Sequence, residues 1–304
     1  MDGQKLELYE IKKPPSIFAL YWREIRADKL CLLAFIVIVS IMGFVIIMSP
    51  IITTDAATTV NLPLRHSPPS WVYGGVEGFI LGTDHGGRNM YYLLVVAARN
   101  SLLIGFGVGI VSLSAGIFIG LIAGYYGGHF DNVVMRLVDT WVMIPSFMFI
   151  IALIEMTPNF TIWRFILYLS IFGWMGHARL IRNGTLQLSN MDYVVASKTL
   201  GTYGYKIIMR KILPNLAPII MPIVVLTMST SIGIEVGLTI LGFGLPIGSP
   251  SLGTIVQNAV HLGNLQHRWW MWLPAIMLMF VMCLSINFVG QAMQRASDPK
   301  QRLK

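Results

Sequence analysis

The sequence has few charged residues. Asp, Glu, Lys and Arg make up 12% of its 304 residues, whereas hydrophobic residues make up 55%. Soluble domains carry about 25% charged residues, so most of this chain has too little charge to face water. The mean hydropathy of +0.67 points the same way. The composition therefore excludes an ordinary soluble domain and predicts a protein that lies mostly in a lipid bilayer.

Cysteine is also scarce. Cys31 and Cys283 are the two present, and both fall within apolar runs far apart in the sequence. This placement is typical of small buried side chains and predicts neither a disulfide framework nor a metal site. The first apolar run begins near Leu30, behind a polar tail, and is too long for the core of a signal peptide. We therefore expect no cleavable signal.

Sequence patterns for several kinds of chemistry are missing as well. The chain has no Gly-x-x-x-x-Gly-Lys-Ser/Thr segment to cradle ATP phosphates. It also lacks Gly-x-Ser-x-Gly and His-Glu-x-x-His, and its six histidines are scattered. We expect no catalytic residue, no metal site and no cofactor. The net charge of +8 comes from cations in the tails and one loop, without an aromatic-interleaved basic face. This argues against nucleic-acid binding.

The sequence does contain long apolar segments. A helix that crosses the ~30 Å hydrocarbon core of a bilayer needs about 20 apolar residues. Six segments meet this test, and they are residues 30–52, 101–123, 134–156, 162–180, 216–241 and 270–293. Small and polar residues interrupt the fourth of these segments. The predicted fold is therefore an all-α polytopic membrane protein with six transmembrane helices.

The distribution of Lys and Arg predicts the orientation, because cytoplasmic segments carry an excess of both. Sixteen of the 22 cations lie in the first tail, the loop after the fourth span and the last tail. We therefore expect both tails (1–29 and 295–304) and this loop in the cytoplasm. The first span covers residues 30–52, an extracytoplasmic loop covers 53–96, and the remaining five spans form a domain over 97–294.

Two long segments fall on the outer side. Residues 50–100 and 242–269 are rich in proline and glycine, which predicts irregular structure. The second segment leads into Trp269, Trp270 and Trp272. Tryptophans gathered in this way mark the outer membrane interface at the start of the last span.

The most informative segment is the polar loop at about residues 183–215. Ser, Asn and Asp within residues 189–192 can begin a helix, and Gly201 is a natural end for it. A second helix over residues 203–212 is expected to stop before Pro214, since the residue that precedes a proline is pushed out of the helical region. The predicted shape is helix, glycine turn and helix across the cytoplasmic face.

This loop has two physical interpretations. A short helix with small and apolar side chains can insert into a groove of another protein. A basic amphipathic hairpin can instead lie on anionic lipid headgroups through its lysines. In the first interpretation, the residues that dock are Tyr193, Val194, Val195, Ala196, Ser197, Leu200, Gly201, Leu213 and Pro214.

The loop resembles the coupling loop of ABC-importer permeases. That family's consensus runs Glu-Ala-Ala-x-x-x-Gly and later ends at Ile-x-x-x-Leu-Pro. Here Val195-Ala196-Ser197 precedes Gly201, and Ile208 and Ile212-Leu213-Pro214 follow. Val195 departs from the consensus at the Glu position, and Lys211 stands where many members have His. The resemblance favours a docking helix over a lipid-bound hairpin.

Further segments extend the resemblance, in order, over roughly residues 80–300. These segments are similar to the second permease subunit of dipeptide- and oligopeptide-type importers, although Asn89 stands in place of Asp. The segments are Leu-Gly-Thr-Asp-His-Gly-Gly-Arg-Asn (81–89), Ala-Arg-Asn-Ser-Leu (98–102), Gly-Tyr-Tyr-Gly-Gly (124–128), Met-Arg-Leu-Val-Asp (135–139), Ile-Pro-Ser (144–146) and Glu-Val-Gly-Leu-Thr-Ile-Leu-Gly-Phe-Gly (235–244). The resemblance implies a type I ABC-importer transmembrane domain over residues 97–294 in a bacterial or archaeal cytoplasmic membrane. It also implies a heterodimer with a homologous permease, two cytoplasmic ATPase subunits and an extracytoplasmic substrate-binding protein.

The predicted outer loop contains three ionisable side chains close together in the sequence, just after a glycine. Asp84, His85 and Arg88 follow Gly82 closely. A metal or catalytic site would need further ligands at a suitable spacing. We therefore favour a structural turn, which also offers Gly82, Asp84 and Arg88 to a binding protein.

Two acids lie within the predicted spans, where ionisable residues are costly. Asp139 is expected to pair with Arg136, one helical turn away. Glu235 has two open interpretations, a structural partner or a residue of the substrate path. Gly233 and Gly237 thin the helix around it, and with Met228 they form a possible pore or gate.

Glycine and proline predict how the helices pack and bend. A Gly-x-x-x-Gly spacing predicts close contact between helix backbones, and proline can kink a helix. The residues concerned are Gly116, Gly120, Gly124, Pro145, Pro218 and Pro222.

The predicted function is the permease subunit of an ATP-driven importer that translocates oligopeptides or dipeptides. Nickel or a metal chelate is the alternative substrate, since that branch shares the motifs. A passive channel needs no long cytoplasmic loop, and an intramembrane enzyme lacks its motifs, so both are disfavoured.

Overall fold

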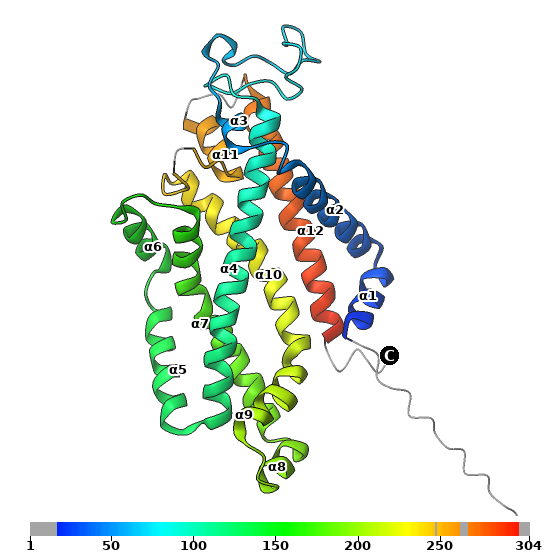
Figure 1. Ribbon diagram of the computed structural model, residues 1–304, viewed down its shortest axis with the longest axis vertical. Helices are drawn as coiled ribbons and strands as arrows, with labels where there is room; N and C mark the ends of the chain where they lie inside the picture. Colours follow the sequence, from blue (N-terminus) through cyan, green and yellow to red (C-terminus); the bar gives the residue numbers. More distant parts are fainter. Residues whose placement is uncertain (1–16, 247, 262–266, 298–304) are drawn as a thin grey trace, which may run out of the picture.

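The computed structural model describes residues 17–246, 248–261 and 267–297. Over these ranges the chain is helical, with no strand beyond the single bridge between Thr83 and Asn89. The helices form an elongated bundle (Figure 1). Predictions about tail residues 1–16 and 298–304 lie outside the described ranges. In chain order the elements are α1 (Ile17–Ala27), α2 (Lys29–Met48), α3 (Thr54–Thr58), η1 (Leu62–Leu64), α4 (Met90–Tyr126), α5 (Gly128–Val142), α6 (Ser146–Glu155), α7 (Ile162–Ser189), α8 (Asp192–Thr199), α9 (Gly204–Ile207), η2 (Ile208–Ile212), α10 (Leu213–Ile240), α11 (Leu252–His261), η3 (Trp269–Met271) and α12 (Leu273–Ser297).

Four of the described helices are long and apolar enough to cross a membrane, or five if the bent pair α5–α6 counts as one span. The four are α2, α4, the continuous helix from α9 through α10 (Gly204–Ile240) and α12. Helix α7 runs beside α4 (Figure 1), but Arg164, His177 and Arg179 make it more polar. With α7, each of the six predicted spans corresponds to a helical element. The predicted all-α membrane fold is confirmed.

The third predicted span, residues 134–156, is not one straight helix. It divides into α5 and α6, whose axes are bent by 80° at the break. Pro145 causes the break, because it has no N–H to donate and it disfavours helical geometry at the residue before it. Helix α6 therefore begins afresh at Ser146, with Pro145 at its N-cap.

Other helix boundaries also differ from the prediction. Helix α4 begins at Met90, inside the predicted outer loop, where the Asn89 side chain accepts a hydrogen bond from the backbone N–H of Tyr91. Helix α7 continues to Ser189, although the apolar segment ends near residue 180. The 37 residues of α4 correspond to about 55 Å at 1.5 Å per residue, well beyond the hydrocarbon core. Hydropathy finds only the apolar middle of such helices.

Helices α4 and α7 pack backbone to backbone through the predicted glycine stripe. A Cβ added at Gly116 would lie 2.6 Å from the Cβ of His177, and one at Gly120 would lie 2.6 Å from the Ala178 carbonyl oxygen. One at Gly124 would lie 2.7 Å from the Arg182 carbonyl oxygen. No real Cβ is tolerated at such distances, so glycine is required along this stripe. The prediction of close helix packing is confirmed.

Helix α10 continues through its prolines. The prediction that the second helix of the loop stops before Pro214 is wrong, because η2 is a π-helical turn that joins α9 directly to α10. A π turn widens the helix where Pro214 removes a donor, which relieves the expected clash.

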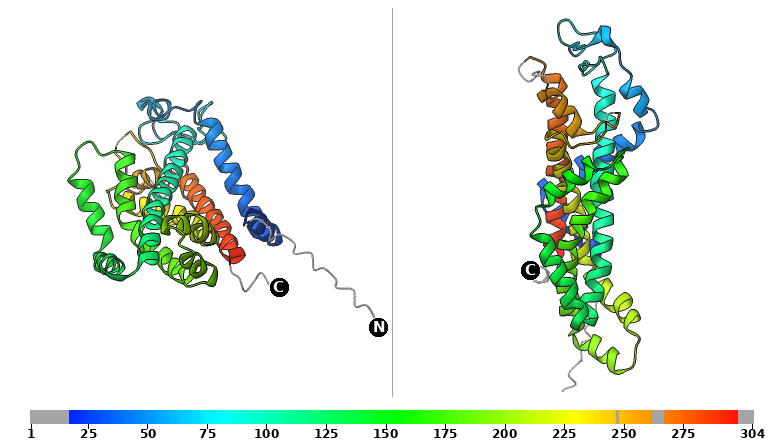
Figure 2. Two further views of the ribbon diagram at one scale, coloured as in Figure 1. Left: turned by 60° about the horizontal axis from the view of Figure 1, so that its bottom comes forward. Right: turned by 90° about the vertical axis from the view of Figure 1, so that its left-hand side faces the viewer.

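A carbonyl orphaned by Pro222 joins both ends of the described chain to α10. Pro222 has no N–H, so the carbonyl of Pro218 loses its helical partner. The Tyr21 hydroxyl of α1 donates to that oxygen at 3.1 Å, and the Ser297 hydroxyl of α12 lies within hydrogen-bond distance of it. Arg295 also pairs with Glu24 at 3.4 Å. Helices α1 and α12 therefore lie side by side at their ends (Figures 1 and 2).

Ion pairs tie α5 to α7 at the end of the bundle near α8. Arg182 forms a two-point contact with Asp131, with 2.9 Å between Nε and Oδ1. Asp139 pairs with Arg179. The predicted pairing of Asp139 with Arg136 is wrong, because α7 packs against α5 and brings Arg179 to the carboxylate.

The opposite end of the bundle is more ordered than predicted. It contains α3, η1, η3 and α11, a ten-residue helix within the segment expected to be irregular. The tryptophan cluster joins the two outer segments. Trp270 donates from Nε1 to the Thr83 carbonyl oxygen at 3.2 Å, and the rings of Trp71 and Trp269 lie 5.7 Å apart.

Candidate functional site

Helix α8 projects from one end of the bundle, at the bottom of Figure 1. It begins at Asp192, an acid in the first turn, and Lys198 lies in the last turn. Both charges suit the helix dipole. The helix ends before Gly201, which adopts φ +74°, a left-handed conformation that side chains disfavour. The predicted helix and glycine turn are present.

One face of α8 anchors it to the start of the α9–α10 helix. Val194 is fully buried beside Ile207 and Ile212. Ser197 is 4% exposed and accepts a hydrogen bond from Lys211 Nζ at 2.5 Å. The sequence assigns both Val194 and Ser197 to the docking surface, but burial removes them from any exposed surface.

The other face of α8 is exposed and largely apolar. Leu200 is 84% exposed, and the side chains of Tyr193, Val195 and Ala196 also face solvent. Val195 adds a β-branched apolar side chain where the coupling-loop consensus has a carboxylate. At the position of Val195 this exposed face therefore offers a partner apolar area in place of a carboxylate. Pro214 is exposed and Leu213 half-buried, and both belong to the first turn of α10.

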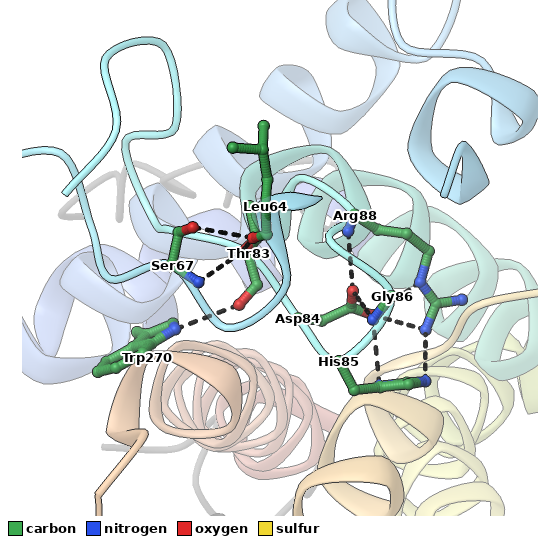
Figure 3. Close-up of polar contacts among 8 residues, drawn as sticks. All are labelled: Leu64, Ser67, Thr83, Asp84, His85, Gly86, Arg88 and Trp270. Atoms are coloured by element: carbon green, nitrogen blue, oxygen red, sulfur yellow. Dashed lines mark hydrogen bonds and ion pairs between the residues drawn. The ribbon is translucent and has the colours of Figure 1, made fainter. Parts of the chain in front are cut away.

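The outer-loop residues form a tight turn at the other end of the molecule (Figure 3). Asp84 is 4% exposed, and its carboxylate accepts hydrogen bonds from the backbone N–H groups of Gly86 and Arg88, both at 2.9 Å. Arg88 Nε also donates to Asp84 at 2.7 Å. Gly82 has φ +70°, and a Cβ there would lie 2.6 Å from the Ser67 carbonyl oxygen. The left-handed φ and the close approach of the Ser67 carbonyl therefore both require glycine at position 82.

The turn borders a cavity of about 280 Å³. His85 lines this cavity, and its Nε2 atom lies 3.4 Å from the Nη2 atom of Arg88. Burial lowers the pKa of His85, and the positive charge of Arg88 lowers it further, although Asp84 opposes this. The imidazole is therefore neutral near pH 7. No group of three or more His, Cys, Asp or Glu side chains suited to a metal occurs in the described part of the chain.

Glu235 lies in the interior of the chain among hydroxyl groups. It is fully buried and accepts hydrogen bonds from Ser251 at 2.6 Å, Thr239 at 3.0 Å and Ser101 at 3.4 Å. Three donors satisfy much of its hydrogen-bonding capacity. Because Ser101 belongs to α4 and Ser251 precedes α11, this cluster fixes α11 against the outer halves of α4 and α10.

The other three residues of the predicted gate are placed differently. Met228 is 5% exposed and packs against α4, where a Cβ added at Gly109 would meet its Cγ at 3.6 Å. Gly233 is exposed, with no atom within 4 Å of an added Cβ, and Gly237 lies near the ring of Phe147. The four residues therefore do not gather around one opening within this chain, and a pore or gate role for them stays a prediction.

The sequence does not reveal some residues that organise these sites. Ser101 and Glu235 are separated by 134 positions, and nothing in their local pattern pairs them. Lys211 stands out only as a departure at a position where related loops have His, yet it holds α8 to the bundle through Ser197. Such long-range contacts depend on helix packing.

Comparisons with known proteins agree with this architecture. The family model for binding-protein-dependent transport system inner membrane components matches residues 116–303. The oligopeptide transport system permease protein OppC of Lactococcus lactis is 39% identical over 278 residues, which cover 91% of this chain and 93% of that protein. OppC of Bacillus subtilis is 32% identical over 303 residues, covering 99% and 94%. The dipeptide transport system permease protein DppC of Haemophilus influenzae is 31% identical, covering 95% and 96%.

A solved structure shares the fold. An inward-facing structure of the MetNI methionine ABC transporter aligns with a TM-score of 0.57 and 19% identity, covering 69% of this chain and 98% of that chain. This likeness supports the predicted type I importer fold and says nothing of substrate. The family match and these relatives show that the chain is the membrane component of a transport system. The chain belongs to the family of binding-protein-dependent transport system inner membrane components and is a permease subunit of an ABC importer.

Proposed function

We propose that this chain translocates peptides, either oligopeptides or dipeptides, across the cytoplasmic membrane. The observation that carries the proposal is its similarity, over nearly its whole length, to permeases named for oligopeptide and dipeptide transport. Nickel and metal chelates are less favoured, because these relatives are named for peptides.

Helix α8 is the proposed contact with an ATPase subunit. Its exposed face carries Tyr193, Val195 and Leu200, while Val194 and Ser197 hold it to the bundle. Because α9, η2 and α10 form one continuous helix, displacement of α8 by an ATPase would pass directly into a membrane span. A rigid lever of this kind can convert closure of the ATPases into movement of the bundle.

The proposed assembly contains this chain, a homologous permease, two cytoplasmic ATPases and an extracytoplasmic binding protein. In this arrangement α8 and both chain ends lie in the cytoplasm, which agrees with the positive charge there. The Gly82–Arg88 turn and its cavity then face the binding protein. Neither face requires a cofactor bound to this chain.

The test is transport by the complete importer reconstituted in proteoliposomes, with ATP on the ATPase side and binding protein on the other. We expect ATP-dependent accumulation of a radiolabelled pentapeptide and none of Ni²⁺. ATP-dependent uptake of Ni²⁺ alone would assign the alternative substrate, and uptake without ATP would indicate a passive channel. Either result would overturn the proposal.

A further inference from the structure

We infer that a cavity within the membrane bundle holds a neutral part of the passing peptide, one apolar side chain with its backbone amide. This inference rests on the proposed peptide transport and adds a contact site inside the permease. The site is separate from α8 and from the outer turn. It is formed by four helices of this chain, α4, α6, α7 and α10.

The cavity has a volume of about 240 Å³. Its lining includes Ser146 and Phe147, at the start of α6 directly after the break at Pro145. Small-molecule sites usually occupy roughly 300–1,000 Å³. The space therefore suits part of a peptide better than a whole one. Apolar side chains form one part of its wall, and they are Val108, Phe147, Ile150, Leu169, Phe172 and Ile234.

Hydroxyl groups and one imidazole form the rest of the wall. Ser231 is 3% exposed, and its hydroxyl has no hydrogen-bond partner among the described residues. Thr230 donates to the carbonyl oxygen of Thr227 at 3.0 Å, so its lone pairs stay available as acceptors. His177 Nε2 and Thr227 Oγ1 lie 3.0 Å apart. The cavity thus offers both donors and acceptors at membrane depth.

The lining distinguishes a peptide from other occupants. None of the residues around the cavity carries a carboxylate, an ammonium or a guanidinium group. A lipid chain could fill the apolar part but would leave the Ser231 hydroxyl without a partner, which costs free energy in hydrocarbon. A peptide brings both an apolar side chain and an amide that donates and accepts. The lack of full charges favours neutral residues at this point of the path.

The test compares two pentapeptides, Ala-Ala-Gly-Ala-Ala and Ala-Ala-Leu-Ala-Ala, in the reconstituted importer. Thr230→Phe fills the cavity from an exposed position of α10, where a larger side chain does not disturb the core. We expect the ratio of leucine-peptide to glycine-peptide uptake to fall about tenfold, because the apolar side chain loses its pocket. Comparing ratios cancels the preference of the binding protein itself.

Met221→Phe is the matched control, since Met221 is also exposed on α10 but does not line the cavity. It should leave the ratio unchanged. An unchanged ratio in Thr230→Phe, with or without an equal loss of both peptides, would overturn the inference. If the unaltered importer takes up neither of these pentapeptides nor a dipeptide such as Ala-Leu, the proposed function itself fails.

Removing the buried hydroxyl provides a second measurement that does not depend on a bulky residue. Ser231→Ala should reduce uptake of both peptides severalfold while ATP hydrolysis persists, because the backbone amide loses a partner. Ser285→Ala is its control, since Ser285 is also buried in a span but lies outside the cavity. Equal effects of the two alanine variants would contradict a role for Ser231 in substrate contact.

Discussion

Gly201 is the residue on which the position of α8 depends most directly. Its φ of +74° is left-handed, and an added Cβ would meet no atom within 4 Å, so backbone strain alone opposes substitution. We predict that Gly201→Val leaves membrane insertion intact but raises the ATP hydrolysed per peptide transported. Gly127→Val is the control, because Gly127 has a similar φ of +61° in the α4–α5 turn. Normal uptake and coupling in Gly201→Val would count against the proposed transmission of movement from α8 to the α9–α10 helix.

Gly120 must be glycine because a side chain there would collide with α7, and not because of its backbone conformation. We predict that Gly120→Ala lowers the free energy of unfolding by about 1–3 kcal/mol, because overpacking forces α4 and α7 apart. Gly176→Ala should have little effect, since no atom lies within 4 Å of an added Cβ there. Thermal unfolding of the purified chain in detergent would measure both. Equal melting temperatures for the two variants would contradict the packing argument.

His85 and His66 make the outer loop sensitive to acid. Burial lowers the pKa of both side chains. Below about pH 6.5 the unfolded chain therefore binds protons that the folded loop does not, so stability falls as pH falls. We predict a smaller loss of melting temperature between pH 7.5 and pH 5 for His85→Gln than for the unaltered chain. An identical pH profile for the two proteins would exclude His85 as a source of this sensitivity.

At the scale of elements, α1, α10 and α12 are coupled through the Pro218 carbonyl. We predict that Tyr21→Phe destabilises the protein by about 1 kcal/mol. The same substitution should cost less in a Pro222→Ala background, where the restored N–H can satisfy that oxygen. A double-mutant cycle on thermal stability measures the difference. Additive effects would show that the two residues act independently.

The sequence predicts a helix well where local composition determines its position, and poorly where contacts between distant residues determine its position. Apolar length places the six spans, and Gly201 places the end of α8. The break at Pro145 and the unbroken passage through Pro214 both involve proline, so only packing separates these outcomes. Helix α11 escapes prediction although Ser251 stands at its N-cap and accepts a hydrogen bond from the backbone N–H of Thr254, because the proline- and glycine-rich residues before it favour irregular structure and the contact of Ser251 with Glu235 is long-range. The Asp139–Arg179 pair likewise depends on how α5 meets α7.

At the scale of the whole molecule, the proposed orientation places α8 and the outer loop on opposite sides of the membrane. Tyr73 in the outer loop and Leu200 after α8 are both highly exposed. We predict that a membrane-impermeant maleimide labels Tyr73→Cys in intact cells but labels Leu200→Cys only after the cells are permeabilised. The native Cys31 is buried and Cys283 half-buried, so the unaltered protein serves as background. The reverse labelling pattern would invert the topology.

The Pro218 carbonyl has a consequence for how the chain is completed during synthesis. Its two partners, Tyr21 and Ser297, are 276 positions apart in the chain. A ribosome that has made Tyr21 and Pro218 must therefore still add the residues up to Ser297 before this oxygen gains both neighbours. A product truncated near its C-terminus would keep one donor but lose the other. The loss of the second of these two hydrogen bonds would distinguish an unfinished permease from a finished one.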